Sequence, residues 1–156
     1  MSNIVYDSKK ERIAVVEGNK TIPDSKEMEF AFPQVDPGQR PFGGRVIVQL
    51  RRISKKVGSF IIATETKENE KWNNMIGKVV AIGPLAFKNR DTMQPWAEGS
   101  WAEIGDFVRV PRWGGDRWER IVDGENGEDP VLFMTINDHE LISAVTDNPL
   151  SFKTYV

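Results

Sequence analysis

The chain has 156 residues and a mass of 17.7 kDa, which fits one domain with room for an extra arm. Hydrophobic residues make up 39% and charged residues 28%, a balance typical of a soluble globular protein and unlike that of a disordered chain. The lack of cysteine excludes a disulfide scaffold, a thiolate zinc site and a cysteine nucleophile, and a formal net charge of −2 disfavours nonspecific binding to nucleic acid or anionic membranes.

Residues 1–40 predict an N-terminal extension. Charged stretches alternate with short apolar ones, and Pro23, Pro33 and Pro37 interrupt the second half. Residues 13–16 (IAVV) suit one short strand, but the proline spacing argues against a core, so we expect this arm to be separable from the main domain. The polar start of the chain and the lack of a run of about 20 apolar residues predict a cytoplasmic protein without a membrane span.

The remaining chain carries short β-like segments separated by glycine and proline. Residues 45–50 (RVIVQL) predict a buried strand, because they are largely β-branched and apolar. Further strands are expected at residues 77–82, 106–110, 117–122, 131–136 and 141–145. Asn137 and Asp138 are suited to cap one helical turn.

No long segment has helical periodicity, so the predicted fold class is all-β. Short strands at close spacing indicate a small antiparallel β-barrel, which we expect to occupy residues 41–145. The domain organisation is then an extension over residues 1–40, the barrel, and a tail over residues 146–156.

Two connections are longer than hairpins require, and long loops in compact domains are commonly functional. The first, residues 54–74, is mostly hydrophilic apart from three consecutive apolar residues: Phe60, Ile61 and Ile62. The second, residues 85–103, contains three large aromatic side chains: Phe87, Trp96 and Trp101. The alternative interpretation of the apolar tripeptide is a strand of the core.

Residue types needed for catalysis or metal binding do not occur in suitable patterns. His139, the one histidine, has no nucleophile motif near it and is best interpreted as a solvated or capping residue. The acidic residues between 123 and 129 lack the spacing of a calcium-binding loop. The paired glycines at 43–44 and 114–115 lack the pattern of phosphate-binding loops. The sequence therefore predicts a protein that is not an enzyme and holds no metal and no cofactor.

One alternative function stays open, the binding of single-stranded nucleic acid. The basic run of residues 51–56 (RRISKK) is able to contact phosphate. The bases would stack on four tryptophans: Trp96, Trp101, Trp113 and Trp118. Because the chain as a whole is acidic, the basic run is more simply interpreted as the solvated base of a loop.

The order of the segments resembles the GroES co-chaperonin family over about residues 40–145. The chain reads RPFGGRVIVQ, then a long polar loop with GSFII, then GKVVAIGP, GDFVRVPRWGG and DHELISAV. The most specific pieces are residues 77–84 and 105–115. The chain departs from the family in its extension, its tail, its enlarged turn at 123–130 and Trp113 in place of tyrosine, elaborations that resemble a bacteriophage version.

The resemblance implies a GroES-like barrel with a mobile loop, a roof hairpin and no catalysis of its own. The mobile loop would dock on a GroEL-type chaperonin through its tip: Gly58, Ser59, Phe60, Ile61 and Ile62. The roof hairpin would carry Phe87, Trp96 and Trp101. The subunits would form a homo-oligomeric, heptameric ring through an interface of six residues: Pro41, Phe42, Val46, Leu141, Ile142 and Val145.

In that family the partner chaperonin binds ATP, so the resemblance implies no cofactor for this chain. It also implies that an unfolded substrate protein is enclosed beneath the ring in the nucleotide-bound state. The expected setting is the bacterial cytoplasm, in the phage case that of an infected host.

Overall fold

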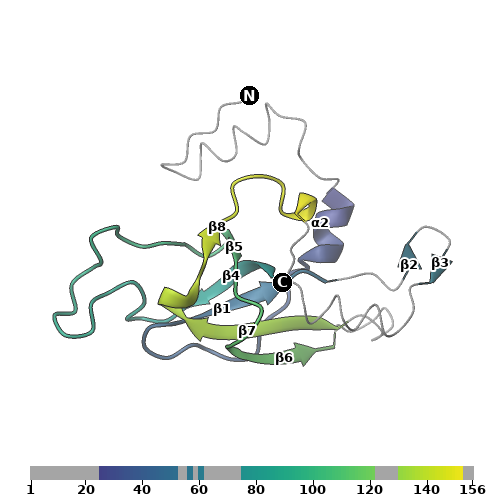
Figure 1. The fold of residues 1–156 in the computed structure, drawn as a ribbon. Coiled ribbons are helices and arrows are strands. Elements are labelled where there is room, and N and C mark those ends of the chain that lie inside the picture. Colours follow the sequence, from purple (N-terminus) through teal and green to yellow (C-terminus); the bar gives the residue numbers. More distant parts are fainter. Residues whose placement is uncertain (1–24, 53–55, 58–59, 62–74, 122–129, 153–156) are drawn as a thin grey trace.

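The computed structural model describes residues 25–52, 56–57, 60–61, 75–121 and 130–152 (Figure 1). In these residues the fold is all-β, which confirms the predicted class: one antiparallel six-stranded sheet, a separate two-stranded sheet and very little helix. Over the same ranges, no helix is both long enough and apolar enough to cross a membrane.

The strands of the main sheet follow the predicted segments. In chain order they are β1 (Arg45–Leu50), β4 (Ile76–Ile82), β5 (Phe107–Arg109), β6 (Asp116–Arg120), β7 (Val131–Asn137) and β8 (Ser143–Ala144). The helical elements are α2 (Ser25–Ala31) and two 3-10 turns, η1 (Asp138–Glu140) and η2 (Pro149–Ser151). The turn η1 is the one expected at Asn137 and Asp138, whereas α2 was not predicted.

The predicted closed barrel is not confirmed, because the sheet is open. The strand order is β6-β7-β1-β4-β5-β8, with every neighbouring pair antiparallel. A barrel would require β6 to pair with β8, and no such pairing occurs among the described residues. With only two residues, β8 offers too short a ladder to close the sheet.

Both faces of the central strand β1 are buried. Successive side chains of a strand point to opposite faces, so Val46, Val48 and Leu50 lie on one face and Ile47 and Gln49 on the other, and all five are buried. Antiparallel sheets commonly bury one face and expose the other. This sheet therefore has two separate covers.

The first face, here called the roof face, is covered by the loop between β4 and β5 and by Leu141. Its core joins strand residues to loop residues: Val46, Val48, Leu50, Val79, Val108, Val110, Leu132, Met134 and Ile136 contact Ala86, Phe87, Ala102 and Leu141. This cover comes from connections between the strands of the sheet itself.

The second face, here called the strap face, has a smaller core of Ile47, Val131 and Phe133. Partly buried neighbours pack against it: Val35, Val80, Ala81 and Trp118. The pairing of β1 with β4 shifts between Ile47 and Val48, a β-bulge that leaves Val80 unpaired. Both Val80 and the following Ala81 consequently pack on this face, although neighbouring strand residues normally point apart.

Residues 30–37 (FAFPQVDP), here called the strap, cross the strap face. The Phe32 ring lies 5.0 Å from that of Phe107. The Gln49 Nε2 group donates to the Pro33 carbonyl at 2.8 Å, and the Trp118 Nε1 group donates to the Pro37 carbonyl at 2.9 Å. The contacts follow one row of paired residues across the sheet: Trp118, Phe133, Gln49, Lys78 and Phe107.

The expectation of an arm without packed contacts therefore does not hold for residues 30–37. Pro33 and Pro37 keep residues 32–37 out of a helix or a sheet ladder, but a prolyl carbonyl still accepts hydrogen bonds. The prolines leave the strap extended, and its carbonyls are used by side chains of the sheet.

Candidate binding surfaces

The two described residues of the apolar tripeptide, Phe60 and Ile61, lie in a small hairpin outside the main sheet. Strand β2 (Lys56–Val57) pairs with β3 (Phe60–Ile61) in a separate two-stranded sheet, with Lys56 opposite Ile61 and Val57 opposite Phe60. Figure 1 shows the hairpin well to one side of the six-stranded sheet. The alternative interpretation, that the tripeptide is a core strand, has no support in the pairing of Phe60 and Ile61.

Three of the five predicted tip residues, Gly58, Ser59 and Ile62, lie outside the described residues. Two residues separate β2 from β3, the length typical of a tight hairpin turn. The described pair Phe60 and Ile61 forms β3, one strand of the hairpin.

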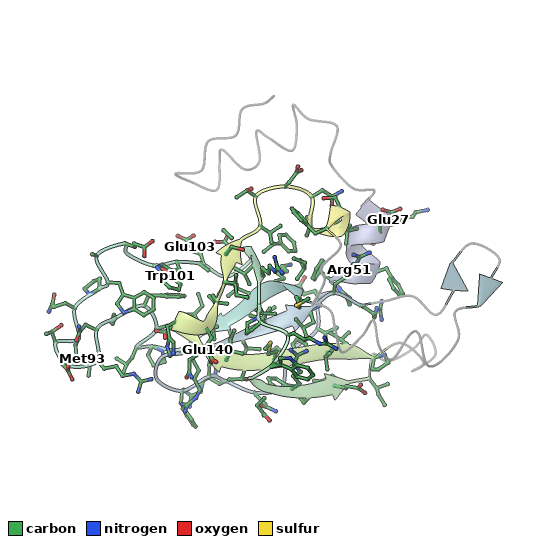
Figure 2. All side chains as sticks on the ribbon, viewed as in Figure 1. Glu27, Arg51, Met93, Trp101, Glu103 and Glu140 are labelled. Carbon is green, nitrogen blue, oxygen red and sulfur yellow. The ribbon has the colours of Figure 1, made fainter. Side chains whose placement is uncertain are left out.

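The loop that carries this hairpin has well-defined ends on the sheet. At one end the Arg51 amide donates to the Ile76 carbonyl at 3.3 Å, and at the other Met75 is buried while its carbonyl accepts from the Val110 amide at 2.8 Å. Arg52, the next residue, contacts the strap. Figure 2 shows Arg51 beneath α2, where the chain leaves the sheet. The two ends of the loop are thus held side by side.

The three aromatic residues of the second long loop are brought together. Ring centroids are 5.5 Å apart between Phe87 and Trp96, 4.7 Å between Trp96 and Trp101, and 6.4 Å between Phe87 and Trp101. The loop has hairpin character, because the Trp96 amide donates to the Phe87 carbonyl and Lys88 forms a β-bridge with Pro95. Met93 marks the far end of this loop in Figure 2.

Phe87 anchors this loop to the roof face through its backbone as well as its ring. Its φ of 63° lies in the left-handed region that side chains rarely adopt. Its amide donates at 2.8 Å to Oδ2 of Asp138, a carboxylate only 5% exposed. Oδ1 of Asp138 accepts from the His139 amide at 2.7 Å, and the Asp138 amide donates to the Gly44 carbonyl. Asp138 therefore joins the aromatic loop to the end of β7 through its carboxylate, and to the turn before β1 through its backbone amide.

Sequence reasoning assigned Asp138 only to a helical turn and missed this role. A buried carboxylate with two amide donors is a strong tertiary constraint, but its partner Phe87 is 51 positions away in the sequence. His139 is exposed, and its Nδ1 lies 3.4 Å from Oδ1 of Asp138, in keeping with a solvated residue beside the turn.

The six residues of the predicted subunit interface fall into two groups. Pro41, Val46 and Leu141 are buried within the subunit. Val46 is 0% exposed and lies in a central strand paired on both sides, so it is not accessible to a neighbour. Phe42 is 65% exposed and Ile142 is 53% exposed, and Val145 is half-buried. A surface contact is thus open to Phe42, Ile142 and Val145.

A groove of about 390 Å³ runs along β8, the edge strand of the sheet. Its apolar lining includes Trp101, Val108, Leu141 and Ile142, and Glu98 adds a carboxylate that accepts from Trp101 Nε1 at 3.2 Å. Figure 2 shows Trp101 in the loop that extends beside β8. The groove joins the aromatic loop to the predicted interface segment.

The four tryptophans of the nucleic-acid alternative do not form one stacking platform. Trp96 and Trp101 pack on each other and on Phe87, while Trp118 stacks on Phe133 and donates to the strap. Trp113 is 74% exposed, with the guanidinium of Arg112 4.7 Å from its ring centroid. Of the basic run, residues 53–55 lie outside the described residues.

Arg117 is a structural cation. Its guanidinium donates to the Pro111 and Arg112 carbonyls at 3.3 and 2.9 Å, and burial lowers the pKa of Arg117 from its ordinary value. The side chain therefore braces the connection between β5 and β6.

Within the described part of the chain, no group of three or more His, Cys, Asp or Glu side chains is placed to hold a metal ion. No protein-family model matches the chain, and no curated protein matches its sequence at a significant level.

Proposed function

We propose that this chain is a ring-forming co-chaperonin of the GroES type, which caps a GroEL-type chaperonin in its nucleotide-bound state and encloses an unfolded protein. The observation that carries the proposal is the β2–β3 hairpin, which presents Phe60 and Ile61 between β1 and β4 in the chain but outside the six-stranded sheet. This is the position of the mobile loop in the family that the motif order resembles.

A hairpin strand with two apolar residues suits a contact that forms and breaks repeatedly. Burying one apolar side chain in a partner groove contributes about 1.5–3 kcal/mol, part of which is offset by the ordering of the loop. One loop alone would bind weakly. Several identical loops on a ring raise the effective concentration of one another, so the assembly binds tightly while each contact stays reversible.

In the proposed function the chain catalyses no reaction and needs no cofactor, because the chaperonin binds the ATP. Its contribution is geometric: a ring holds the hairpins at the spacing of the partner's subunits, and the sheet below them forms the lid.

Two surfaces support assembly into a ring. The groove along β8 has a mixed lining of apolar side chains with Glu98, Ser100 and Ser143, and Phe42 is an exposed ring, with the Arg40 guanidinium 5.1 Å from its centroid. They are different surfaces of one subunit, as a head-to-tail contact requires. In the proposed ring Phe42 of one subunit meets the groove of the next, and β8 gains a neighbour for its open edge.

The hairpin is tested by Ile61→Asp, using a pull-down with a purified GroEL-type chaperonin and ATP alongside thermal melting. A charge in β3 should abolish capture and leave the melting temperature nearly unchanged, because β3 is not part of the main sheet. Ile121→Asp is the matched control, since Ile121 is equally apolar and 70% exposed at the end of β6. Capture of the Ile61 variant, or failure of the unaltered chain to bind, would rule out the proposal.

Ring formation is tested by sedimentation velocity at micromolar concentration. The unaltered chain should sediment as a single oligomer, and Phe42→Asp should shift it to monomer while its circular dichroism spectrum is retained. A monomeric unaltered chain would contradict the ring.

A further inference from the structure

The loop that carries the hairpin leaves the sheet at a residue that the strap holds in three ways. The Arg52 amide donates to the Ala31 carbonyl at 2.8 Å. Its Nε group donates to the Phe30 carbonyl at 2.9 Å, and its guanidinium carbon lies 4.1 Å from the centroid of the Phe30 ring. All of these partners lie where α2 passes into the strap.

This combination of contacts is specific to arginine. A planar guanidinium is able to stack on an aromatic ring and donate through Nε at the same time, whereas an ammonium group acts as a single compact charge. The backbone contact fixes the position of the chain at residue 52, and the two side-chain contacts fix its orientation there.

The strap is itself fixed on the sheet beyond this point. Gln49 donates to Pro33, and Trp118 donates to Pro37 at the far end of the same row of strand residues. The contacts of Arg52 therefore connect residue 52 to the sheet by a second route, in addition to the chain itself through β1.

We propose that Arg52 is a positioning residue for the hairpin: by binding the strap it fixes the direction in which the loop leaves the sheet, and this raises the affinity of the loop for its partner. The effect on affinity rests on the proposed co-chaperonin function, while the fixing of the loop root does not. A loop with a fixed root explores fewer orientations, so a ring of such loops presents its tips at a higher effective concentration and loses less entropy on docking.

The chain has no cysteine, so Ser59→Cys provides a unique attachment point for a fluorescent dye between β2 and β3. The full-length labelled chain is compared with three further variants by time-resolved fluorescence anisotropy. Arg52→Ala removes both side-chain contacts, and Phe30→Leu removes only the ring under the guanidinium. Trp118→Phe is the matched control, because it removes a strap hydrogen bond at the end remote from the loop.

Arg52→Ala should lower the residual anisotropy of the dye, Phe30→Leu should lower it less, and Trp118→Phe should leave it unchanged. In a chaperonin-binding assay with ATP, Arg52→Ala should weaken the affinity by about tenfold, because a small loss per loop multiplies around a ring.

The role of Arg52 is overturned if Arg52→Ala leaves the anisotropy unchanged, or if Trp118→Phe lowers it equally. If the unaltered chain does not bind a chaperonin at all, the proposed function fails, while the anisotropy comparison still decides whether Arg52 fixes the loop. If Arg52→Ala does not fold, the anisotropy of Phe30→Leu still decides the question, because this variant removes the ring that the Arg52 guanidinium contacts.

Discussion

The two faces of the sheet are buried by different means. The roof face is covered by side chains: Phe87, Ala86 and Ala102 of one long connection enter an apolar core together with Leu141. The strap face is covered by a segment that contacts the sheet through the side chains of Phe32 and Val35 and through two backbone carbonyls, which accept from Gln49 and Trp118. One cover belongs to the connections of the sheet, and the other is added from residues that precede it in the chain.

The comparison shows why β1 is apolar at nearly every position. A strand with one solvated face would alternate apolar and polar residues, whereas Ile47 and Gln49 are buried on the strap face. Gln49 is the polar exception, and its side chain donates to the strap. Burial of both faces of the sheet therefore depends on residues of the expected extension.

The largest expected effect is that of removing the strap. Deleting residues 1–37 should abolish cooperative folding and give an aggregating chain, because Phe133, Ile47 and Val131 would lose their cover. Circular dichroism melting and light scattering measure both effects. Deleting residues 1–24 is the matched control and should preserve the melt. Cooperative melting of the shorter chain near the temperature of the full chain would show that the strap is dispensable.

A second test compares one large side chain from each face. Phe133→Ala and Phe87→Ala should each lower the free energy of unfolding by about 3–5 kcal/mol, since both rings are buried. Phe133 lies inside β7, where neighbours cannot collapse into the space, so its loss should be the greater. Urea denaturation gives both values. A larger effect at Phe87 would show that the aromatic loop is the more rigid cover.

The buried carboxylate of the roof face gives an intermediate effect. Asp138→Ala should lower the free energy of unfolding by about 1–3 kcal/mol, because the Phe87 amide is left without its acceptor. Asp138→Asn retains one acceptor oxygen and should cost less. Both are measured by urea denaturation, and equal losses for the two variants would indicate that the negative charge, not the hydrogen bond, is what matters.

The smallest effect is expected at the far end of the strap. Trp118→Phe keeps an aromatic ring against Phe133 but removes the donor to Pro37, so the loss should be about 0.5–1.5 kcal/mol. Thermal melting is sufficient to detect it. An unchanged melting temperature would mean that the remaining contacts hold the strap without this hydrogen bond.

The strands were predictable because their residue types act locally. The β-branched run of β1, the glycines and prolines that bound β4, and the turn before β8 mark elements within a few positions. The strap was not predictable in this way, since Pro33 and Pro37 argue against regular structure, while their carbonyls bind partners 16 and 81 positions away. α2, with seven residues, is too short to show periodicity.

The sequence predicted which residues belong to the candidate surfaces better than it predicted how those residues are arranged. The aromatic residues of the second loop were identified together and lie together, because apolar residues in a polar loop gather on the nearest core. The pairing of Phe60 with Val57 and the buried position of Val46 depend on register and strand order, which the residue types of one segment do not determine.

The two edges of the sheet differ in a way that affects how far the molecules can associate. β6 exposes a charged sequence, DRWER, which discourages a further strand from pairing there, whereas β8 is uncharged but only two residues long. Neither edge offers the long, flat, uncharged ladder from which a sheet extends through one molecule after another. In the proposed ring, contacts at β8 would therefore be completed by side chains that line the groove, and one neighbouring subunit would occupy that groove. This difference favours an assembly of defined size over a fibre.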